Sequence, residues 1–140
     1  MTEVDLTKEN KKPDMNTKVM LVDDDSFLLD MYSLKFKNAG YEVEAVNDPN
    51  VALDRIRGGY EPDIVLFDIV MPGTGGWGFI KQIREEKLIP KVTAIVLSNQ
   101  GQQSDFDESK EYKVDGYVVK ALSTPSEVLE KVKGIHSSKK

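Results

Sequence analysis

Four apolar runs of the sequence end directly at residues that can bind a cation, carry a charge or donate a hydroxyl hydrogen bond. Each run has the composition of a buried β-strand, and the strands of a parallel sheet bring their carboxyl ends to one edge. We therefore expect these polar residues to meet in space although they are distant in the sequence. They are Asp23, Asp24 and Asp25 after the first run, Asp68 after the third, Ser98 after the fourth and Lys120 after the fifth.

Carboxylates gathered at one edge repel each other, since two unit charges about 4 Å apart cost on the order of 4 kcal/mol at an effective dielectric constant of about 20. A divalent cation, the ammonium group of Lys120 or protonation of one carboxylate would offset this cost. A site of few oxygen ligands suits Mg²⁺, which keeps several waters and prefers sites shared with phosphate. A single Asp after a strand would only cap the next helix, as we expect of Asp25 before Ser26. The whole cluster favours a functional site.

The elements that must position these residues alternate between strands and helices, a pattern typical of βαβ units and a parallel sheet. If the strand order is 2-1-3-4-5, strands one and three are neighbours, and this order would bring Asp23 or Asp24 beside Asp68. The third run is apolar on both faces, as a central strand requires. The predicted strands are 19–22, 41–46, 64–67, 92–97 and 118–119.

The predicted helices have recognisable ends. Gly40 is suited to the left-handed end of the first helix. The second helix starts at Asp48 and Pro49, with Asp48 as the N-cap and Pro49 in the first turn. Thr124 and Glu127 form a capping box that starts the last. The predicted helices cover 26–39, 49–57, 77–86, 102–112 and 125–135, the fourth being weak because it has few apolar anchors.

The composition excludes several classes of function. The chain is 39% hydrophobic and 31% charged, the balance of a soluble, single-domain globular protein. With no cysteine it has no disulfide scaffold, no cysteine zinc site and no thiol nucleophile. The net charge of −5 argues against broad binding to nucleic acid or anionic lipid. No apolar stretch exceeds four residues, so we expect no membrane span, no signal peptide and a cytoplasmic location.

The glycine-rich loop 73–78 offers a second interpretation, because it formally matches the G-x-G-x-x-G phosphate-binding pattern. Its context is poor for a dinucleotide site. The loop follows the third predicted strand rather than the first, Pro72 precedes it, and the next strand ends at Ser98 instead of an acidic ribose ligand. A flavodoxin-like or dinucleotide-binding protein is therefore the less favoured alternative.

The sequence resembles the receiver domains of two-component response regulators from about Lys18 to Ile135. Four stretches, specific when they occur together in this order, carry the resemblance: VDDD at 22–25, DIVLFDIVMP at 63–72 with Gly76 after it, AIVLS at 94–98 and GYVVK at 116–120. The resemblance implies a flavodoxin-like (βα)5 α/β fold, which is a doubly wound, all-parallel open sheet of order 2-1-3-4-5. It also implies a CheY-like receiver, here of the stand-alone type.

The resemblance implies a phosphorelay chemistry for the acidic residues. Asp68 would accept a phosphoryl group from a phosphohistidine on a sensor histidine kinase or a histidine phosphotransfer protein. Asp24 and Asp68 would bind Mg²⁺ or Mn²⁺ directly, and Asp23 would bind it through a water molecule. The backbone carbonyl of Val70 would complete the protein ligands. The protein would be a phosphoacceptor that assists its own phosphorylation and dephosphorylation, not an enzyme acting on a separate substrate.

The resemblance also implies a conformational switch. Lys120 would pair with one phosphoryl oxygen, and Ser98 would move to hydrogen-bond another while Tyr117 changes rotamer. A downstream protein would read the change through region 102–123 and the last helix. We expect no nucleic acid or membrane partner, and either a monomer or a phosphorylation-dependent dimer.

The chain departs from the family pattern after the active lysine and at two tuning positions. Ala121 replaces the usual proline, where a cis bond would cost about 3 kcal/mol. This departure keeps open a degenerate receiver that serves only as an interaction module. Val70 and Gln100, two residues after Asp68 and Ser98, occupy positions that influence hydrolysis of the acyl phosphate. Because valine cannot orient water, we expect a long-lived phosphorylated form with Gln100 as the only side chain of the two able to position water.

The predicted domain occupies residues 18–137. Residues 1–17 have almost no large apolar side chains and are predicted to form a disordered tail. A second short tail is predicted at 138–140. His136, near the end of the last helix, is predicted to be exposed.

Overall fold

The computed structural model describes residues 16–99, 107, 110–120 and 123–139. Five strands form one parallel sheet in the order β2-β1-β3-β4-β5, as predicted. Because Val22 of β1 pairs with Phe67 of β3, the residues that follow these two lie at the same level of the sheet edge. The strands are β1 (Lys18–Val22), β2 (Glu42–Val46), β3 (Ile64–Phe67), β4 (Thr93–Ser98) and β5 (Gly116–Val119).

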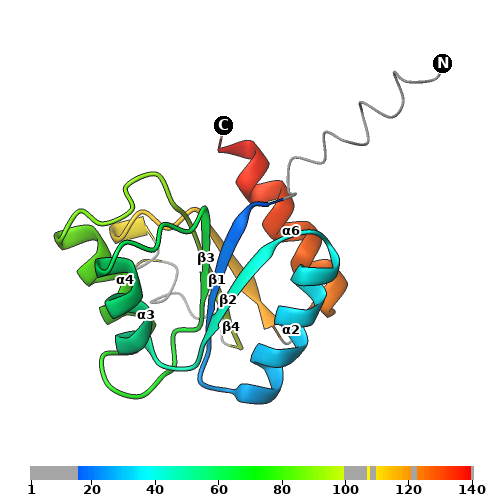
Figure 1. Ribbon diagram of the computed structural model, residues 1–140, viewed down its shortest axis with the longest axis horizontal. Coiled ribbons are helices and arrows are strands. Elements are labelled where there is room, and N and C mark those ends of the chain that lie inside the picture. The colour runs from blue at the N-terminus through cyan, green and yellow to red at the C-terminus, as the bar shows by residue number, and fades with distance from the viewer. Residues whose placement is uncertain (1–15, 100–106, 108–109, 121–122, 140) are drawn as a thin grey trace.

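Helices cover both faces of the sheet (Figure 1). Helices α3 (Pro49–Arg57) and α4 (Gly75–Glu85) lie on one face, and α2 (Ser26–Asn38) and α6 (Pro125–Ser138) lie on the other. Each pair of helices buries its own apolar core against the strands. No helix within the described ranges has the length and hydropathy needed to cross a membrane.

The alternation of side chains along the strands decides which side of the sheet each polar strand end continues. In β3, Val65 and Phe67 belong to the core with α3 and α4, whereas Ile64 and Leu66 belong to the core with α2 and α6. Strands β1 and β5 alternate in the same way, with Leu21 and Val118 in the α2 and α6 core. Side chains along a strand point alternately to the two faces of the sheet. The first residue after each strand that faces α2 and α6 is therefore Asp23 for β1, Asp68 for β3 and Lys120 for β5.

The helix ends follow the predicted capping chemistry. The Asp25 carboxylate accepts a hydrogen bond from the Leu28 N–H at the start of α2. The Asp48 carboxylate accepts one from the Asn50 N–H at the start of α3. Thr124 and Glu127 form the complete capping box of α6. Each cap satisfies backbone donors that would otherwise lack a partner at a helix start.

Several boundaries differ from the predictions by one to three residues, with α4 beginning at Gly75 instead of 77 and α6 ending at Ser138 instead of 135. The predicted tails, 1–17 and 138–140, each include residues that the structure places in contact with the domain. Thr17 is buried, and its carbonyl accepts the Glu42 N–H at 2.9 Å. Lys139 caps α6, and its Nζ donates to the Val92 carbonyl at 2.6 Å. Most of the predicted helix 102–112, like residues 1–15, lies outside the described residues.

His136 is half-buried, and the prediction that it is exposed is wrong. Its Nδ1 lies 2.8 Å from the Oγ1 of Thr93, at the first residue of β4. The threonine is almost fully buried, so the imidazole supplies a hydrogen-bond partner to a hydroxyl that water does not reach. The contact joins α6 to the sheet and could not be read from the helix alone.

Gly76 and Gly134 differ in the space that a side chain would have at each position. A Cβ at Gly76 would lie 2.1 Å from the Asp68 carbonyl oxygen, whereas a Cβ at Gly134 would meet nothing within 4 Å. Gly76→Ala should therefore destabilise the fold by roughly 2–3 kcal/mol, the scale of overpacking. Gly134→Ala, in the middle of α6, should stabilise it by about 0.5–1 kcal/mol. Urea unfolding of both variants measures the difference, and equal effects would contradict this account of the packing.

Candidate functional site

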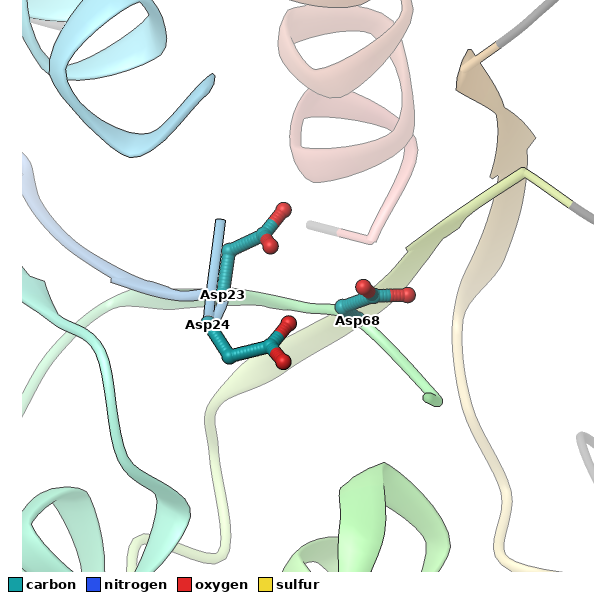
Figure 2. A group of neighbouring side chains, drawn as sticks. All are labelled: Asp23, Asp24 and Asp68. Carbon is teal, nitrogen blue, oxygen red and sulfur yellow. The ribbon is translucent and has the colours of Figure 1, made fainter. Parts of the chain in front are cut away.

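Three carboxylates converge at the carboxyl edge of the sheet (Figure 2). Asp23 and Asp24 follow β1 and Asp68 follows β3, and one ligand oxygen from each lies within 4.8 Å of the others. Asp23 and Asp68 are buried, with 5% and 8% of their surface exposed, whereas Asp24 is exposed. The predicted convergence of distant acidic residues is therefore present in the structure.

Lys120 lies between the two buried carboxylates. Its Nζ is 2.7 Å from Oδ2 of Asp23 and 3.5 Å from Oδ2 of Asp68. The lysine itself is only 7% exposed, so it is not a solvated strand end. Of the three ways to offset the repulsion of the carboxylates, the structure shows the ammonium group in place.

Backbone N–H groups hold the same carboxylates from the loops. Oδ1 of Asp68 accepts hydrogen bonds from the N–H groups of Ile69, at 2.8 Å, and Val70, at 3.4 Å. Oδ1 of Asp23 accepts the Asp25 N–H at 2.9 Å. Each buried carboxylate is thus held by a loop N–H on one oxygen and by Lys120 on the other, which limits its rotation.

Burial dominates the electrostatics of the site. Burial raises the pKa of Asp68, and the nearby charge of Asp23 raises it further, while Lys120 and the two backbone hydrogen bonds act in the opposite direction. Burial alone would lower the pKa of Lys120, but its hydrogen bond to Asp23 and the charge of Asp68 leave that pKa raised. The ammonium group therefore stays charged, and Asp68 gains stability from any further positive charge beside it.

A pocket of about 290 Å³ opens above these groups. Ser98, buried at the end of β4, reaches the pocket as predicted. Val70 lies on its rim with 60% of its surface exposed. Leu28 and Asn99 also line the pocket, although their sequence positions did not indicate it. The lining consists of Asp24, Asp25, Leu28, Asp68, Val70, Ser98, Asn99 and Lys120.

The comparisons with known proteins agree with this geometry. Residues 19–133 match the model of the response regulator receiver domain family. The chain belongs to this family. It is similar to the chemotaxis response regulator CheY4 of Vibrio cholerae, with 26% identity, a TM-score of 0.78, and 86% of this chain and 99% of that chain covered. A CheY-like receiver domain protein of Methanospirillum hungatei JF-1 has 24% identity and a TM-score of 0.79, with 89% and 96% covered.

Membership in the receiver family confirms the resemblance stated from the sequence and places the chain in two-component signalling. It also argues against the dinucleotide interpretation of loop 73–78. Gly76 packs against the backbone of Asp68, and its N–H donates to the Ile69 carbonyl at 2.8 Å. In this receiver the glycine permits close approach of α4 to β3 instead of approach to a phosphate.

The remaining predicted residues of the receiver site lie elsewhere or outside the described ranges. Tyr117 is half-buried in β5 and packs against the core with α3 and α4, on the opposite side of the sheet from Lys120. Its rotamer change stays a prediction. Gln100 and Ala121 lie outside the described residues, so the hydrolysis and cis-peptide predictions that rest on them also stay predictions.

Asp68→Asn should stabilise the metal-free receiver at pH 7 by on the order of 1 kcal/mol, the usual scale of one substitution. The folded-state pKa of Asp68 is raised, so the folded protein holds this proton more tightly than the unfolded chain. Its charge therefore costs stability at pH values above the unfolded pKa, and this cost disappears as the pH falls below about 4.

Chemical denaturation in EDTA at pH 7 and near pH 3.5 tests this sign. The exposed Asp30 on the same protein provides the control, because Asp30→Asn should leave stability nearly unchanged at both pH values. An Asp68→Asn variant that is less stable than the parent at pH 7 would contradict the electrostatic account.

Proposed function

We propose that this receiver accepts a phosphoryl group on Asp68 from a partner phosphohistidine and signals through the resulting conformational change. The observation that carries the proposal is the meeting of Asp68 with Lys120, Asp23 and Asp24 in an accessible pocket, within a chain of the receiver family. A carboxylate is a competent nucleophile for phosphoryl transfer once positive charge screens it from the incoming oxygens.

The donor atoms fit Mg²⁺ or Mn²⁺, and receiver domains generally bind Mg²⁺. All three side chains offer hard oxygen ligands within a few ångströms of each other, and the open pocket leaves room for bound water. Asp24 and Asp68 would hold the ion directly with the Val70 carbonyl. Asp23 already accepts hydrogen bonds from Lys120 and the Asp25 N–H, which supports its contact through water.

In the transfer, the P–N bond of the donor imidazole breaks as a P–O bond to an Asp68 oxygen forms. The bound cation would supply positive charge that neutralises the phosphoryl oxygens. Lys120 has three N–H donors, of which two face Asp23 and Asp68, and it would bind a phosphoryl oxygen as a mobile point charge. The Ser98 hydroxyl would hydrogen-bond another phosphoryl oxygen from β4.

The partners follow from the family. Receiver domains interact with kinases or phosphotransfer proteins and with downstream targets. We propose a histidine kinase or a histidine phosphotransfer protein as the donor and region 102–123 with α6 as the face read by the target. The new charge on Asp68 would shift Ser98 and Tyr117, which continue the same side of β4 and β5. We place this exchange in the cytoplasm.

Incubation with acetyl phosphate and Mg²⁺ should add one phosphoryl group to the protein, as measured by mass spectrometry of the intact chain. Asp68→Asn should abolish this addition because the nucleophile is lost. Asp63→Asn changes an exposed carboxylate at the other end of β3 and is the matched control, which should react like the parent. A parent that gains no phosphoryl group would instead support an interaction module that works without phosphorylation.

Val70→Asn should shorten the lifetime of the phosphorylated form several-fold. Val70 is exposed at the rim of the pocket and cannot orient water, whereas an amide at this position can hydrogen-bond the attacking molecule. Loss of phosphate is followed after removal of acetyl phosphate. Val70→Leu controls for altered packing and should decay like the parent. Equal lifetimes for parent and Val70→Asn would remove this explanation of the slow hydrolysis.

A further inference from the structure

A second, much smaller cavity lies on the protein side of the carboxylate cluster. Its volume is about 10 Å³, close to the minimum that holds one water molecule. Five of its lining residues are apolar, and three are polar: Asp23, Asp68 and Tyr32 of α2. The apolar lining consists of Leu21, Val22, Leu29, Leu66 and Leu97.

Tyr32 is the polar group that the chemistry described above does not use. It is 4% exposed and belongs to the core beneath α2 and α6, the side of the sheet that Asp23, Asp68 and Lys120 continue. Among the residues that the structure describes, none forms a hydrogen bond with its hydroxyl. Burial raises its pKa, and the charges of Lys120 and Asp23 act on that pKa in opposite directions. The cavity that Tyr32 lines together with Asp23 and Asp68 places it beside the cluster.

The two buried carboxylates have hydrogen-bonding capacity left. A carboxylate accepts about four hydrogen bonds. Asp23 receives two, from the Asp25 N–H and Lys120, and Asp68 receives three, of which those from Val70 and Lys120 are long at 3.4 and 3.5 Å. Both groups can therefore accept a further hydrogen bond from a donor in the cavity.

We propose that the cavity binds one water molecule, which accepts a hydrogen bond from the Tyr32 hydroxyl and donates to the carboxylates of Asp23 and Asp68. Three polar partners are the usual number for a buried water. The water gives the Tyr32 hydroxyl a hydrogen-bond partner and contacts both carboxylates from the side of α2 and α6. Tyr32 is thereby a positioning residue for the phosphoacceptor site.

This inference rests on the proposed function only for its kinetic consequence. The water itself can be observed directly in a high-resolution crystal structure of the metal-free protein. We expect density for a single water within hydrogen-bond distance of the Tyr32 hydroxyl and of both carboxylates, and loss of that density in Tyr32→Phe. A dry cavity, or a Tyr32 hydroxyl bonded directly to protein, would overturn the proposal.

The kinetic consequence is tested by comparing two buried tyrosines. Tyr32→Phe removes the hydroxyl at the cavity, whereas Tyr41→Phe removes one from an equally buried tyrosine that follows α2 and packs its ring on Phe36, 5.2 Å away. At saturating Mg²⁺, Tyr32→Phe should slow phosphorylation by acetyl phosphate roughly ten-fold, the effect of one hydrogen bond to a charged group. Tyr41→Phe should react at the parent rate. Equal rates in the two variants would overturn the positioning role.

One further measurement separates positioning from simple damage to the fold. The ¹⁵N–¹H signal of the Lys120 ammonium group should shift in Tyr32→Phe and stay in place in Tyr41→Phe. A Lys120 signal that moves equally in both variants would count against the positioning role. If the parent takes no phosphoryl group, the proposed function fails, while the crystal structure and the lysine signal still decide this inference.

Discussion

The buried ion cluster of Lys120 with Asp23 and Asp68 is the constraint on which the site depends. Two carboxylates with less than a tenth of their surface exposed are unfavourable unless a cation balances them, and the nearest one comes from a different strand. The cluster therefore requires β1, β3 and β5 to end at the same edge and to present the same face. The parallel order with β1 beside β3 meets the first requirement, and the two-residue alternation of the strands meets the second. A single-residue slip of β3 would turn Asp68 away from Lys120.

The fold could be predicted because its signals are local. Apolar runs mark the central strands, and capping residues such as Asp25 and Thr124 mark helix starts, since both depend on chemistry within a few residues. The boundaries that were missed depend on tertiary contacts. Helix α4 starts early because Gly76 lets it approach the backbone of Asp68, and Lys139 extends the last element because its ammonium group reaches the Val92 carbonyl. The residues next to Gly76 and Lys139 in the sequence do not predict either contact.

The same division applies to the site. The polar residues at the strand ends could be assigned to the site from the sequence, because the carboxyl ends of parallel strands share one edge of the sheet. They are Asp23, Asp24, Asp68, Ser98 and Lys120. Two properties required coordinates. Lys120 lies closer to Asp23 than to Asp68, which leaves the Asp68 carboxylate less tightly paired. Tyr32 lies beneath the cluster because α2 turns that face of its helix to the sheet, and its sequence context reads as ordinary helix core.

A set of aromatic contacts attaches β5 to β3 a second time, although β4 lies between them. Phe67, the residue before Asp68, packs edge-on against Trp77 of α4, and Trp77 stacks on Tyr112 with 6.0 Å between ring centroids. Arg84 of the same helix donates to the backbone carbonyls of Tyr112 and Lys113, just before β5 begins. Strand β5 is thus held near its amino end through α4 and at its carboxyl end through Lys120. Both attachments lead to the strand that precedes Asp68, so β5 is fixed relative to that carboxylate at both of its ends.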